Sequence, residues 1–224
     1  MQKKEYIQKM FAGISRHYDL LNHMLSLGRD RSWRRFAVAK LPEGLILDVC
    51  SGTGDVAIEV SGRNRAVASD FCREMLQLCA RKIQEMNNGS ICCVQSDAEN
   101  LSFKDGAFSG AIAAFGIRNV ADIKKALSEM HRVVKKGGRV IVLEFSQPEN
   151  RIFRGIYYLY FKKVLPLIGA AISKKGGAYS YLPSSVMTFP ERGGFVQLMK
   201  ESGMERIELY DLTSGIVTVY VGIK

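Results

Sequence analysis

Short apolar runs of strand length alternate with helical patterns through the middle of this 224-residue chain, and this alternation limits its fold more than any other feature. The runs are nearly continuous in apolar residues, which is typical of parallel strands covered on both faces. Helical segments between them supply the crossovers that parallel strands require. Five strands are predicted in this region, at residues 45–50, 66–70, 91–95, 110–115 and 139–144.

Helices are predicted between these strands at residues 55–61, 74–86 and 123–134, and the last of them ends at Lys135-Lys136-Gly137-Gly138. Two further strands, 206–212 and 216–223, are close enough to form an antiparallel hairpin. The predicted fold is therefore α/β, with a seven-stranded, mostly parallel sheet that ends in an antiparallel hairpin. Residues 4–40 are predicted to form helices that break near Ser26-Leu27-Gly28.

The charge of the chain is uneven. It carries 32 Lys and Arg against 22 Asp and Glu, a formal net charge of +10. Nine basic and three acidic residues fall within 1–40, and six basic and one acidic within 152–192, whereas 41–151 holds fourteen of each. The excess thus belongs to two segments outside the alternating region. This excess of positive charge fits an ordinary solvated surface, and it equally fits attraction to phospholipid or nucleic acid. The charge alone does not decide between these two explanations.

The loop after the first strand, Asp48-Val49-Cys50-Ser51-Gly52-Thr53-Gly54-Asp55, is the first candidate binding site. Ligands of open α/β sheets bind beyond the carboxyl ends of the strands. Gly52 and Gly54 let the backbone turn tightly and approach a ligand with no Cβ in the way. The spacing also fits a dinucleotide fingerprint, with Ala57 in the third position, so the loop alone does not identify its ligand.

Three carboxylates at successive strand ends narrow the choice. Asp70, after the second strand, suits both hydroxyls of a ribose, which NAD and S-adenosylmethionine share. Asp48, before the glycines, would repel a pyrophosphate but suits the ammonium of a methionine moiety. Asp97 and Ala98, after the third strand, are placed to meet the adenine amino group and ring edge. Each Asp alone fits a helix N-cap or turn equally well, yet the ordered set favours S-adenosylmethionine over NAD.

Longer motifs carry a resemblance to a family. The matches include DVCSGTGD at 48–55, FGIRNV at 115–120, EMHRVVKKGGRVIVLEF at 129–145 and YSYLPSSVMTFP at 179–190, of which the second and fourth are the most selective. In these blocks the chain resembles the ubiquinone/menaquinone biosynthesis C-methyltransferases, within the class I S-adenosylmethionine-dependent methyltransferases. The resemblance covers nearly the whole chain and implies a Rossmann-like fold with helical lid elements.

The implied reaction is methylation of a ring carbon of a polyprenylated quinol, such as demethylmenaquinol giving menaquinol. A polyprenyl methoxy-benzoquinol of ubiquinone biosynthesis is the alternative acceptor. By the same resemblance Thr53, Asp70, Asp97 and Ala98 match donor-contacting positions, and Arg118 matches an Arg proposed to act in catalysis. Asp48, Gly52 and Gly54 complete the predicted donor site.

Arg118 is expected to stabilise a phenolate and to orient a water molecule that takes up the quinol proton. An arginine cannot itself be the base at neutral pH, because its pKa exceeds about 12. A structural ion pair with an acidic neighbour is the alternative role. Further acceptor contacts are predicted for Tyr18, Asp19 and Asn22, which share one helical face, and for Tyr179 and Tyr181, although packing or capping explains these side chains as well.

Residues 152–195 hold nine of the 21 aromatic residues of the chain, interleaved with basic side chains. This pattern is typical of a face that lies at a membrane interface, and also of a lid helix that covers an acceptor pocket. We predict one domain over 1–224, composed of an N-terminal helical cap (1–40), a donor-binding core (41–151), a substrate lid (152–192) and C-terminal strands (193–224).

The cysteine pattern suggests the compartment. Five cysteines without a Cys-x-x-Cys pair favour a reducing cytoplasm, and no metal site is predicted because the three histidines lack ligand spacing. We therefore expect a cytoplasmic enzyme in peripheral contact with the inner face of the cytoplasmic membrane, and a homodimer is a further expectation.

Two rival functions are weaker. An RNA methyltransferase would also be basic and bind this donor, but the chain lacks the Asn/Asp-Pro-Pro-aromatic loop after the fourth strand. It also lacks a cysteine placed to attack a pyrimidine, so no nucleic-acid partner is expected. A non-enzymatic NAD-binding module is the second rival. Measuring the binding of S-adenosylhomocysteine and of NADH distinguishes it from a methyltransferase.

Overall fold

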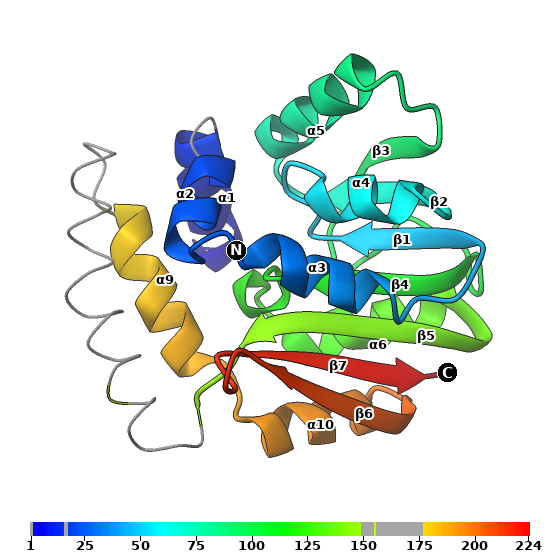
Figure 1. Ribbon diagram of the computed structural model, residues 1–224. Helices are drawn as coiled ribbons and strands as arrows, with labels where there is room; N and C mark the ends of the chain where they lie inside the picture. Colours follow the sequence, from blue (N-terminus) through cyan, green and yellow to red (C-terminus); the bar gives the residue numbers. More distant parts are fainter. Residues whose placement is uncertain (1, 16–17, 149–154, 156–176) are drawn as a thin grey trace.

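The computed structural model describes residues 2–15, 18–148, 155 and 177–224, which form a seven-stranded sheet with helices on both faces and further helices at one end (Figure 1). The strands are β1 (Leu45–Val49), β2 (Arg65–Asp70), β3 (Ile91–Gln95), β4 (Phe108–Ala114), β5 (Val134–Phe145), β6 (Glu205–Leu212) and β7 (Val217–Ile223). The helices are α1 (Gln2–Ile14), α2 (Tyr18–Leu25), α3 (Asp30–Val38), α4 (Asp55–Ser61), α5 (Arg73–Glu85), the short 3₁₀ helix η2 (Ile117–Asn119), α6 (Ile123–Val133), α9 (Gly177–Thr188) and α10 (Arg192–Glu201).

The strand order is β3-β2-β1-β4-β5-β7-β6. Strands β1 to β5 are parallel, and β7 is antiparallel to both β5 and β6. The predicted mostly parallel sheet with a C-terminal antiparallel hairpin is therefore confirmed. Because the order of the parallel strands changes direction between β1 and β4, a ligand site is expected beyond the carboxyl ends of these two strands.

Each face of the sheet has its own apolar core. On one face, α6 and α10 bury Leu127, Met130, Phe195 and Met199 against Tyr220 of β7, all at 0% exposure. On the other face, α3 and α4 pack a second cluster that includes buried Trp33, Ala37, Val56, Ala57 and Val60. Burial of each large apolar side chain stabilises the fold by about 1.5–3 kcal/mol, so the two clusters hold the strand ends in fixed positions.

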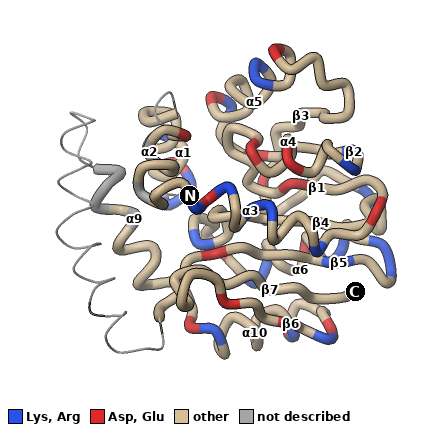
Figure 2. The backbone as a smooth tube through the Cα atoms, in the orientation of Figure 1, with Lys and Arg blue, Asp and Glu red and all other residues tan. Residues whose placement is uncertain are grey.

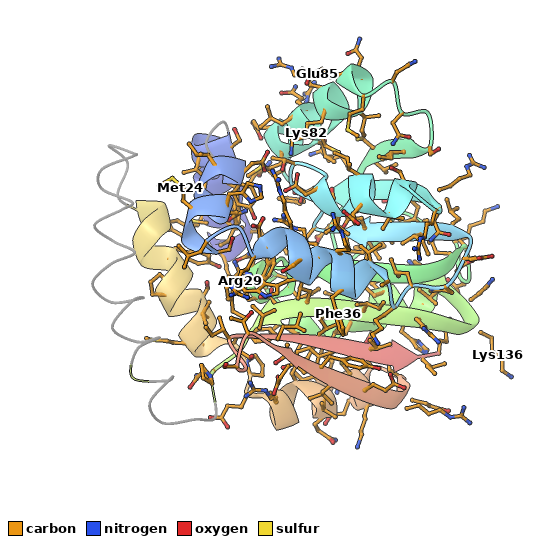
Figure 3. All side chains as sticks on the ribbon, viewed as in Figure 1. Met24, Arg29, Phe36, Lys82, Glu85 and Lys136 are labelled. Carbon is orange, nitrogen blue, oxygen red and sulfur yellow. The ribbon has the colours of Figure 1, made fainter. Side chains whose placement is uncertain are left out.

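The N-terminal helices divide into two groups. The predicted break is confirmed, because Leu27 and Gly28 adopt positive φ angles of 52° and 73° between α2 and α3. Helix α3 lies on the sheet, where the Trp33 indole donates to Thr213 Oγ1 at 2.8 Å. Phe36, labelled in Figure 3, packs on Tyr210 with ring centroids 5.5 Å apart. Helices α1 and α2 instead stand at the carboxyl ends of the strands, beside α9 (Figure 1).

The two larger differences from prediction concern α10 and β5. The expectation of strands alone after residue 193 is wrong at its start, because α10 occupies Arg192–Glu201. Its Gly193 and Gly194 are poor helix formers, and the helix is stabilised by burial of Phe195 and Met199.

Strand β5 also begins earlier than predicted and runs through Lys135-Lys136-Gly137-Gly138. A Cβ on Gly138 would lie 2.5 Å from the Ser109 carbonyl oxygen, so this glycine serves close strand pairing rather than a helix stop.

The predicted lid, 152–192, is described only at residue 155 and from residue 177, where α9 and the start of α10 lie. Most of its basic and aromatic residues are therefore outside the described part of the chain. Within residues 2–15, 18–148, 155 and 177–224, no helix combines the length and apolar character that crossing a bilayer requires.

Candidate active site

The loop from β1 to α4 is shaped by left-handed backbone. Cys50, Gly52 and Gly54 have φ angles of 56°, 54° and 86°. The Asp70 carboxylate at the end of β2 ties this loop down, because Oδ2 accepts a hydrogen bond from Gly52 N and Oδ1 accepts one from Cys72 N, both at 2.8 Å. Burial raises the pKa of Asp70 above its usual value. The loop and the strand end thus act as one unit.

Gly54 fits its position for two reasons. Its φ angle disfavours any side chain, and a Cβ there would lie 2.3 Å from Cys79 Sγ. We expect Gly54→Ala to destabilise the protein by about 1–3 kcal/mol, measured as the free energy of unfolding in urea. Gly89→Ala is the matched control, since a Cβ at Gly89 meets nothing within 4 Å. Equal stability of the two variants would show that the loop has room for a side chain.

A cavity opens between this loop, the ends of β2, β3 and β4, and helix α1. Five of the predicted site residues line it: Tyr18, Gly52, Asp70, Asp97 and Ala98. Others that sequence reasoning did not single out also line it, among them Lys4, Cys50, Ser69 and Phe115. Asp48, Thr53, Gly54, Asp19, Asn22, Arg118 and Tyr181 do not line this cavity.

Asp48 lies beneath the loop. Its side chain is buried, and Oδ2 accepts a hydrogen bond from Ala57 N at 3.0 Å in the first turn of α4. Burial raises the pKa of this carboxyl well above its usual range. The structure therefore gives Asp48 the helix-capping role left open by the sequence, and contact with a ligand ammonium group stays a prediction.

Several buried polar atoms without a hydrogen-bond partner lie near this edge of the sheet. Within the described residues such atoms are Asp48 Oδ1, Ser51 Oγ, Ser69 Oγ, Arg118 Nε and Tyr220 OH. The first three belong to β1, β2 and the loop between β1 and α4. Because buried polar groups in folded proteins are nearly always paired, such a concentration is typical of a site that completes its hydrogen bonds with a polar ligand.

Helix α1 closes the cavity over Asp97. The Lys4 ammonium contacts Asp97 Oδ2 at 2.7 Å and Glu99 Oε2 at 3.1 Å. Burial acts to raise the pKa of Asp97, but the hydrogen bond from Lys4 and one from Glu99 N outweigh it, and the pKa is lowered. Asp97 is therefore a carboxylate at neutral pH. Lys4 was missed because 93 residues separate it from Asp97.

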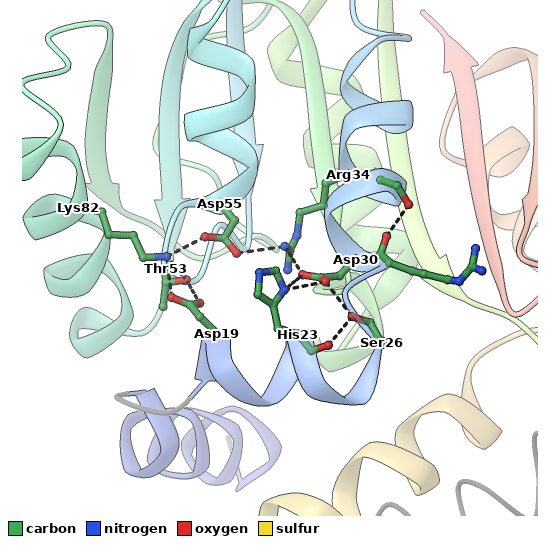
Figure 4. Close-up of polar contacts among 10 residues, drawn as sticks. Asp19, His23, Ser26, Asp30, Arg34, Thr53, Asp55 and Lys82 are labelled. Carbon is green, nitrogen blue, oxygen red and sulfur yellow. Dashed lines mark hydrogen bonds and ion pairs between the residues drawn. The ribbon is translucent and has the colours of Figure 1, made fainter.

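A polar network joins helix α2 to the glycine loop (Figure 4). Thr53 Oγ1 donates to Asp19 Oδ1 at 2.5 Å, and the Lys82 ammonium lies 2.7 Å from carboxylate oxygens of both Asp19 and Asp55. Thr53 and Asp19, predicted to contact different ligands, are thus paired with each other. The network continues through Arg34, which bonds Asp55 and Asp30 at 3.1 and 2.7 Å.

Arg118 lies in η2, immediately after β4, and points back toward the sheet. Its Nη1 contacts Glu144 Oε1 and Oε2 at 3.1 and 2.9 Å and also donates to the Phe115 carbonyl oxygen. The Arg118 side chain is 7% exposed and that of Glu144 is 0% exposed. The acidic neighbour considered from the sequence therefore exists, and it is Glu144.

Two of the predicted acceptor residues, Tyr18 and Tyr181, lie near Arg118. Tyr181 of α9 donates to Asn119 Oδ1 at 3.1 Å, and its ring stacks obliquely on Tyr6 of α1 at 6.2 Å. Burial raises the pKa of Tyr18, against the opposing effects of a hydrogen bond with Asn22 and of the Arg118 charge. The side chain of Tyr179 lies outside the described part of the structure.

The turn after β4 is strained where it meets the glycine loop. Phe115 has a φ angle of 59°, uncommon for a bulky residue, and Cys50 across from it has 56°. A Cβ on Gly116 would lie 2.4 Å from Cys50 Cβ, so the two turns are in direct contact. Residues in such conformations cluster at functional sites. The FGIRNV block was the sequence signal for this turn.

Comparison with known proteins agrees with this geometry. A family model described as the ubiE/COQ5 methyltransferase family matches residues 1–224. A protein of Geobacter sp. (strain M21) named ubiquinone/menaquinone biosynthesis C-methyltransferase is 47% identical, over 100% of this chain and 98% of its own length. A Deinococcus radiodurans protein named demethylmenaquinone methyltransferase is 44% identical, over 99% of this chain and 94% of its own length.

Solved structures with the same fold are more distant in sequence. A crystal structure of a SAM-dependent methyltransferase from Thermotoga maritima superposes with a TM-score of 0.70 at 20% identity, over 96% of this chain and 99% of that one. This similarity confirms the predicted Rossmann-like class I methyltransferase fold.

Proposed function

The chain belongs to the ubiE/COQ5 methyltransferase family, and we propose on that premise that it methylates a ring carbon of demethylmenaquinol to give menaquinol. It is an S-adenosylmethionine-dependent C-methyltransferase of quinone biosynthesis. The observation that carries the assignment of its site is the cavity at the carboxyl ends of β1 to β4, with Asp70 and Asp97 as carboxylates on its wall.

The donor site fits S-adenosylmethionine, which supplies an electrophilic methyl group when bound. We assign the ribose hydroxyls to Asp70 and the adenine edge to Asp97 and Ala98, which line the same cavity. The unpartnered Ser51 and Ser69 hydroxyls and the buried Asp48 Oδ1 are available to the polar groups of the methionine end. Gly52 leaves the cavity wall free of a Cβ on this side. Gly54 and Thr53 are proposed to act indirectly. Gly54 shapes the loop, and Thr53 holds the loop to α2 through its hydrogen bond to Asp19.

We assign catalysis to Arg118. A quinol ring carbon becomes nucleophilic when the neighbouring hydroxyl loses its proton, and the oxygen then needs a positive partner. Arg118 Nε is buried without a partner among the described residues, so this group can bind a developing phenolate. Water takes up the proton, because an arginine side chain stays protonated at neutral pH. Tyr18 and Tyr181 lie within range of the Arg118 charge, and Asn22 is hydrogen-bonded to Tyr18. We propose that these three residues orient the ring.

The acceptor assay tests the proposed function. Purified enzyme is expected to convert short-chain demethylmenaquinol to menaquinol, followed by mass spectrometry of the quinone and by release of S-adenosylhomocysteine. A short-chain demethylated methoxy-benzoquinol is the alternative acceptor and is assayed in parallel. Faster turnover of the benzoquinol would assign the enzyme to ubiquinone biosynthesis instead. Which reaction occurs in the cell is decided by a deletion strain, from the demethylated quinone that accumulates in it.

We further propose peripheral contact with an anionic membrane, where a polyprenylated quinol resides. The sequence pattern at 152–195 supports this, as do Leu20, Met24 and Leu27, which are 55%, 44% and 84% exposed in and after α2. Met24 is labelled in Figure 3. Arg29 and Arg31 follow them closely and are exposed. Apolar side chains bordered by basic ones are typical of interfacial binding. A cytoplasmic location and a homodimer stay predictions.

Neutralising Lys162, Lys163, Lys174 and Lys175 with Gln is expected to reduce pelleting with anionic liposomes, because juxtamembrane basic residues each contribute about 1 kcal/mol. The matched control replaces Lys104, Lys135, Lys136 and Lys200, which are exposed and lie outside residues 152–192 in the sequence. Lys and Arg residues also occur at the end of the sheet away from α1 and α2 (Figure 2), so the control separates local attraction from net charge. Equal pelleting of both variants would contradict the contact.

A further inference from the structure

Glu144 is a fully buried carboxylate at the edge of the sheet where the site lies. It is the penultimate residue of β5, and its side chain is 0% exposed. A buried charge is costly unless it is paired and hydrogen-bonded. Neither the donor cavity nor the proposed acceptor contacts include this residue, so its presence calls for another explanation.

The contacts of Glu144 converge on Arg118. Oε1 and Oε2 accept from Arg118 Nη1 at 3.1 and 2.9 Å, and Oε1 also accepts from the Arg118 backbone N at 3.2 Å. Oε2 accepts a further bond from Phe145 N at 3.1 Å. The carboxylate is therefore fixed by its own strand and in turn holds both the backbone and one end of the Arg118 side chain.

The remaining contacts of the guanidinium fix it from two other sides. Nη1 donates to the Phe115 carbonyl oxygen, and Cζ lies 5.4 Å from the centroid of the Phe145 ring. Glu144 and Phe115 together occupy Nη1 alone. Within the described residues, the hydrogen bonds of the Arg118 side chain all run through Nη1. Nε is buried there without a hydrogen-bond partner, and the side chain is 7% exposed.

The free side of Arg118 is the one suited to an oxyanion. In a guanidinium group the Nε and Nη2 N–H bonds point the same way, and this fork matches an oxygen anion geometrically. Tyr18 and Tyr181 lie close enough to Arg118 for its charge to lower their pKa values against the effect of burial. The two tyrosines thus lie within range of the Arg118 charge, and Nε is the buried donor of this side chain that has no partner among the described residues.

We propose that Glu144 is a positioning residue for methyl transfer, which holds Arg118 by Nη1 so that its Nε and Nη2 fork stays presented to the acceptor oxygen. The proposal rests on the proposed role of Arg118. Its distinguishing feature is orientation: if Glu144 only balanced the buried charge of Arg118, any carboxylate at this position would serve.

Two substitutions separate orientation from charge balance. Glu144→Gln keeps the shape but removes the charge, whereas Glu144→Asp keeps the charge but withdraws the carboxylate by one methylene. Positioning predicts that both lower kcat by about tenfold or more, within the range by which contacting residues couple. The dissociation constant of S-adenosylhomocysteine, measured by calorimetry, is expected to stay near the parent value in both. Glu201→Gln, which removes one acid of an exposed ion pair with Lys124, is the control.

The double variants complete the test. If Glu144 acts through Arg118, then Glu144→Asp added to Arg118→Lys lowers kcat no further than Arg118→Lys alone. Normal kcat in Glu144→Asp, or losses that multiply in the double variant, would overturn the positioning role. If Glu144→Gln fails to fold, Glu144→Asp still decides the question. Failure of the proposed catalytic role of Arg118 gives a different result, in which Arg118→Lys itself leaves kcat unchanged. Failure of the proposed function gives a third result, in which the parent enzyme does not turn over demethylmenaquinol.

Discussion

Replacing Arg118 by Ala is expected to lower turnover of the quinol by about 10²–10³-fold, the usual effect of removing one oxyanion-stabilising donor. Affinity for S-adenosylhomocysteine should stay close to that of the parent enzyme, because Arg118 does not line the donor cavity. Steady-state kinetics with demethylmenaquinol and calorimetry with S-adenosylhomocysteine measure the two effects separately. Donor affinity that falls as far as turnover would point to a structural role for Arg118.

The same substitution carries a stability cost that has to be measured alongside. It leaves Glu144 buried and without its cationic partner, which costs about 3–5 kcal/mol in comparable ion pairs. The double variant Arg118→Ala, Glu144→Ala removes the unpaired charge and is expected to regain much of the free energy of unfolding while turnover stays low. Recovery of turnover in the double variant would show that Arg118 serves folding alone. Arg35→Ala is the matched control, since that side chain is 73% exposed.

Replacing Asp70 by Ala is expected to weaken binding of S-adenosylhomocysteine by about 100-fold or more, because hydrogen bonds to a charged group contribute about 1.5–3 kcal/mol each. The substitution also releases Gly52 N and Cys72 N, which the carboxylate now holds at 2.8 Å. Asp105→Asn is the control, since this carboxylate is 79% exposed and paired with Arg132 at the surface. Calorimetric affinity within threefold of the parent would remove Asp70 from the donor site.

The pH dependence of donor affinity follows from the same residue. Burial raises the pKa of Asp70 above its ordinary value, and the proposed contacts to ribose need the carboxylate. Affinity for S-adenosylhomocysteine is therefore expected to be full at neutral pH and to fall as the pH drops through the raised pKa. The fall should begin at a higher pH than an ordinary Asp, with a pKa of about 3.9, would give. In Asp70→Asn this titration should be absent.

The parallel half of the fold could be predicted because its signals are local. The apolar runs that became β1 to β5 and the helix at Asp55–Ser61 needed only residue type and spacing. Helix α10 was missed because Gly193 and Gly194 oppose a helix locally, while Phe195 and Met199 stabilise it through contacts with a sheet formed elsewhere in the chain. Helix α10 therefore forms because of tertiary burial, which the local sequence pattern does not reveal.

In the candidate site, too, some residues could be predicted from the sequence and others could not. Gly52, Asp70, Asp97 and Ala98, which are predicted to bind the donor, line one cavity, because strand ends in a parallel sheet meet at one edge. The partners of these groups were not predictable. The sequence gives no means of pairing Lys4 with Asp97, or of choosing Glu144 among fourteen acidic residues of the core segment as the neighbour of Arg118. Such pairs depend on side-chain direction at close range.

Phe115 and Cys50, in the two turns that contact each other, limit the thermostability of the protein through their left-handed backbone conformations. Phe115 and Cys50 each hold a conformation that costs an ordinary side chain about 1–2 kcal/mol. Glycine would relieve this cost, yet at Phe115 it would also delete a ring that packs on Phe145 and Trp33 at 4.8 and 6.1 Å. Selection for heat resistance is therefore expected to find stabilising substitutions far from these turns. A substitution that stabilises either turn should also slow methylation.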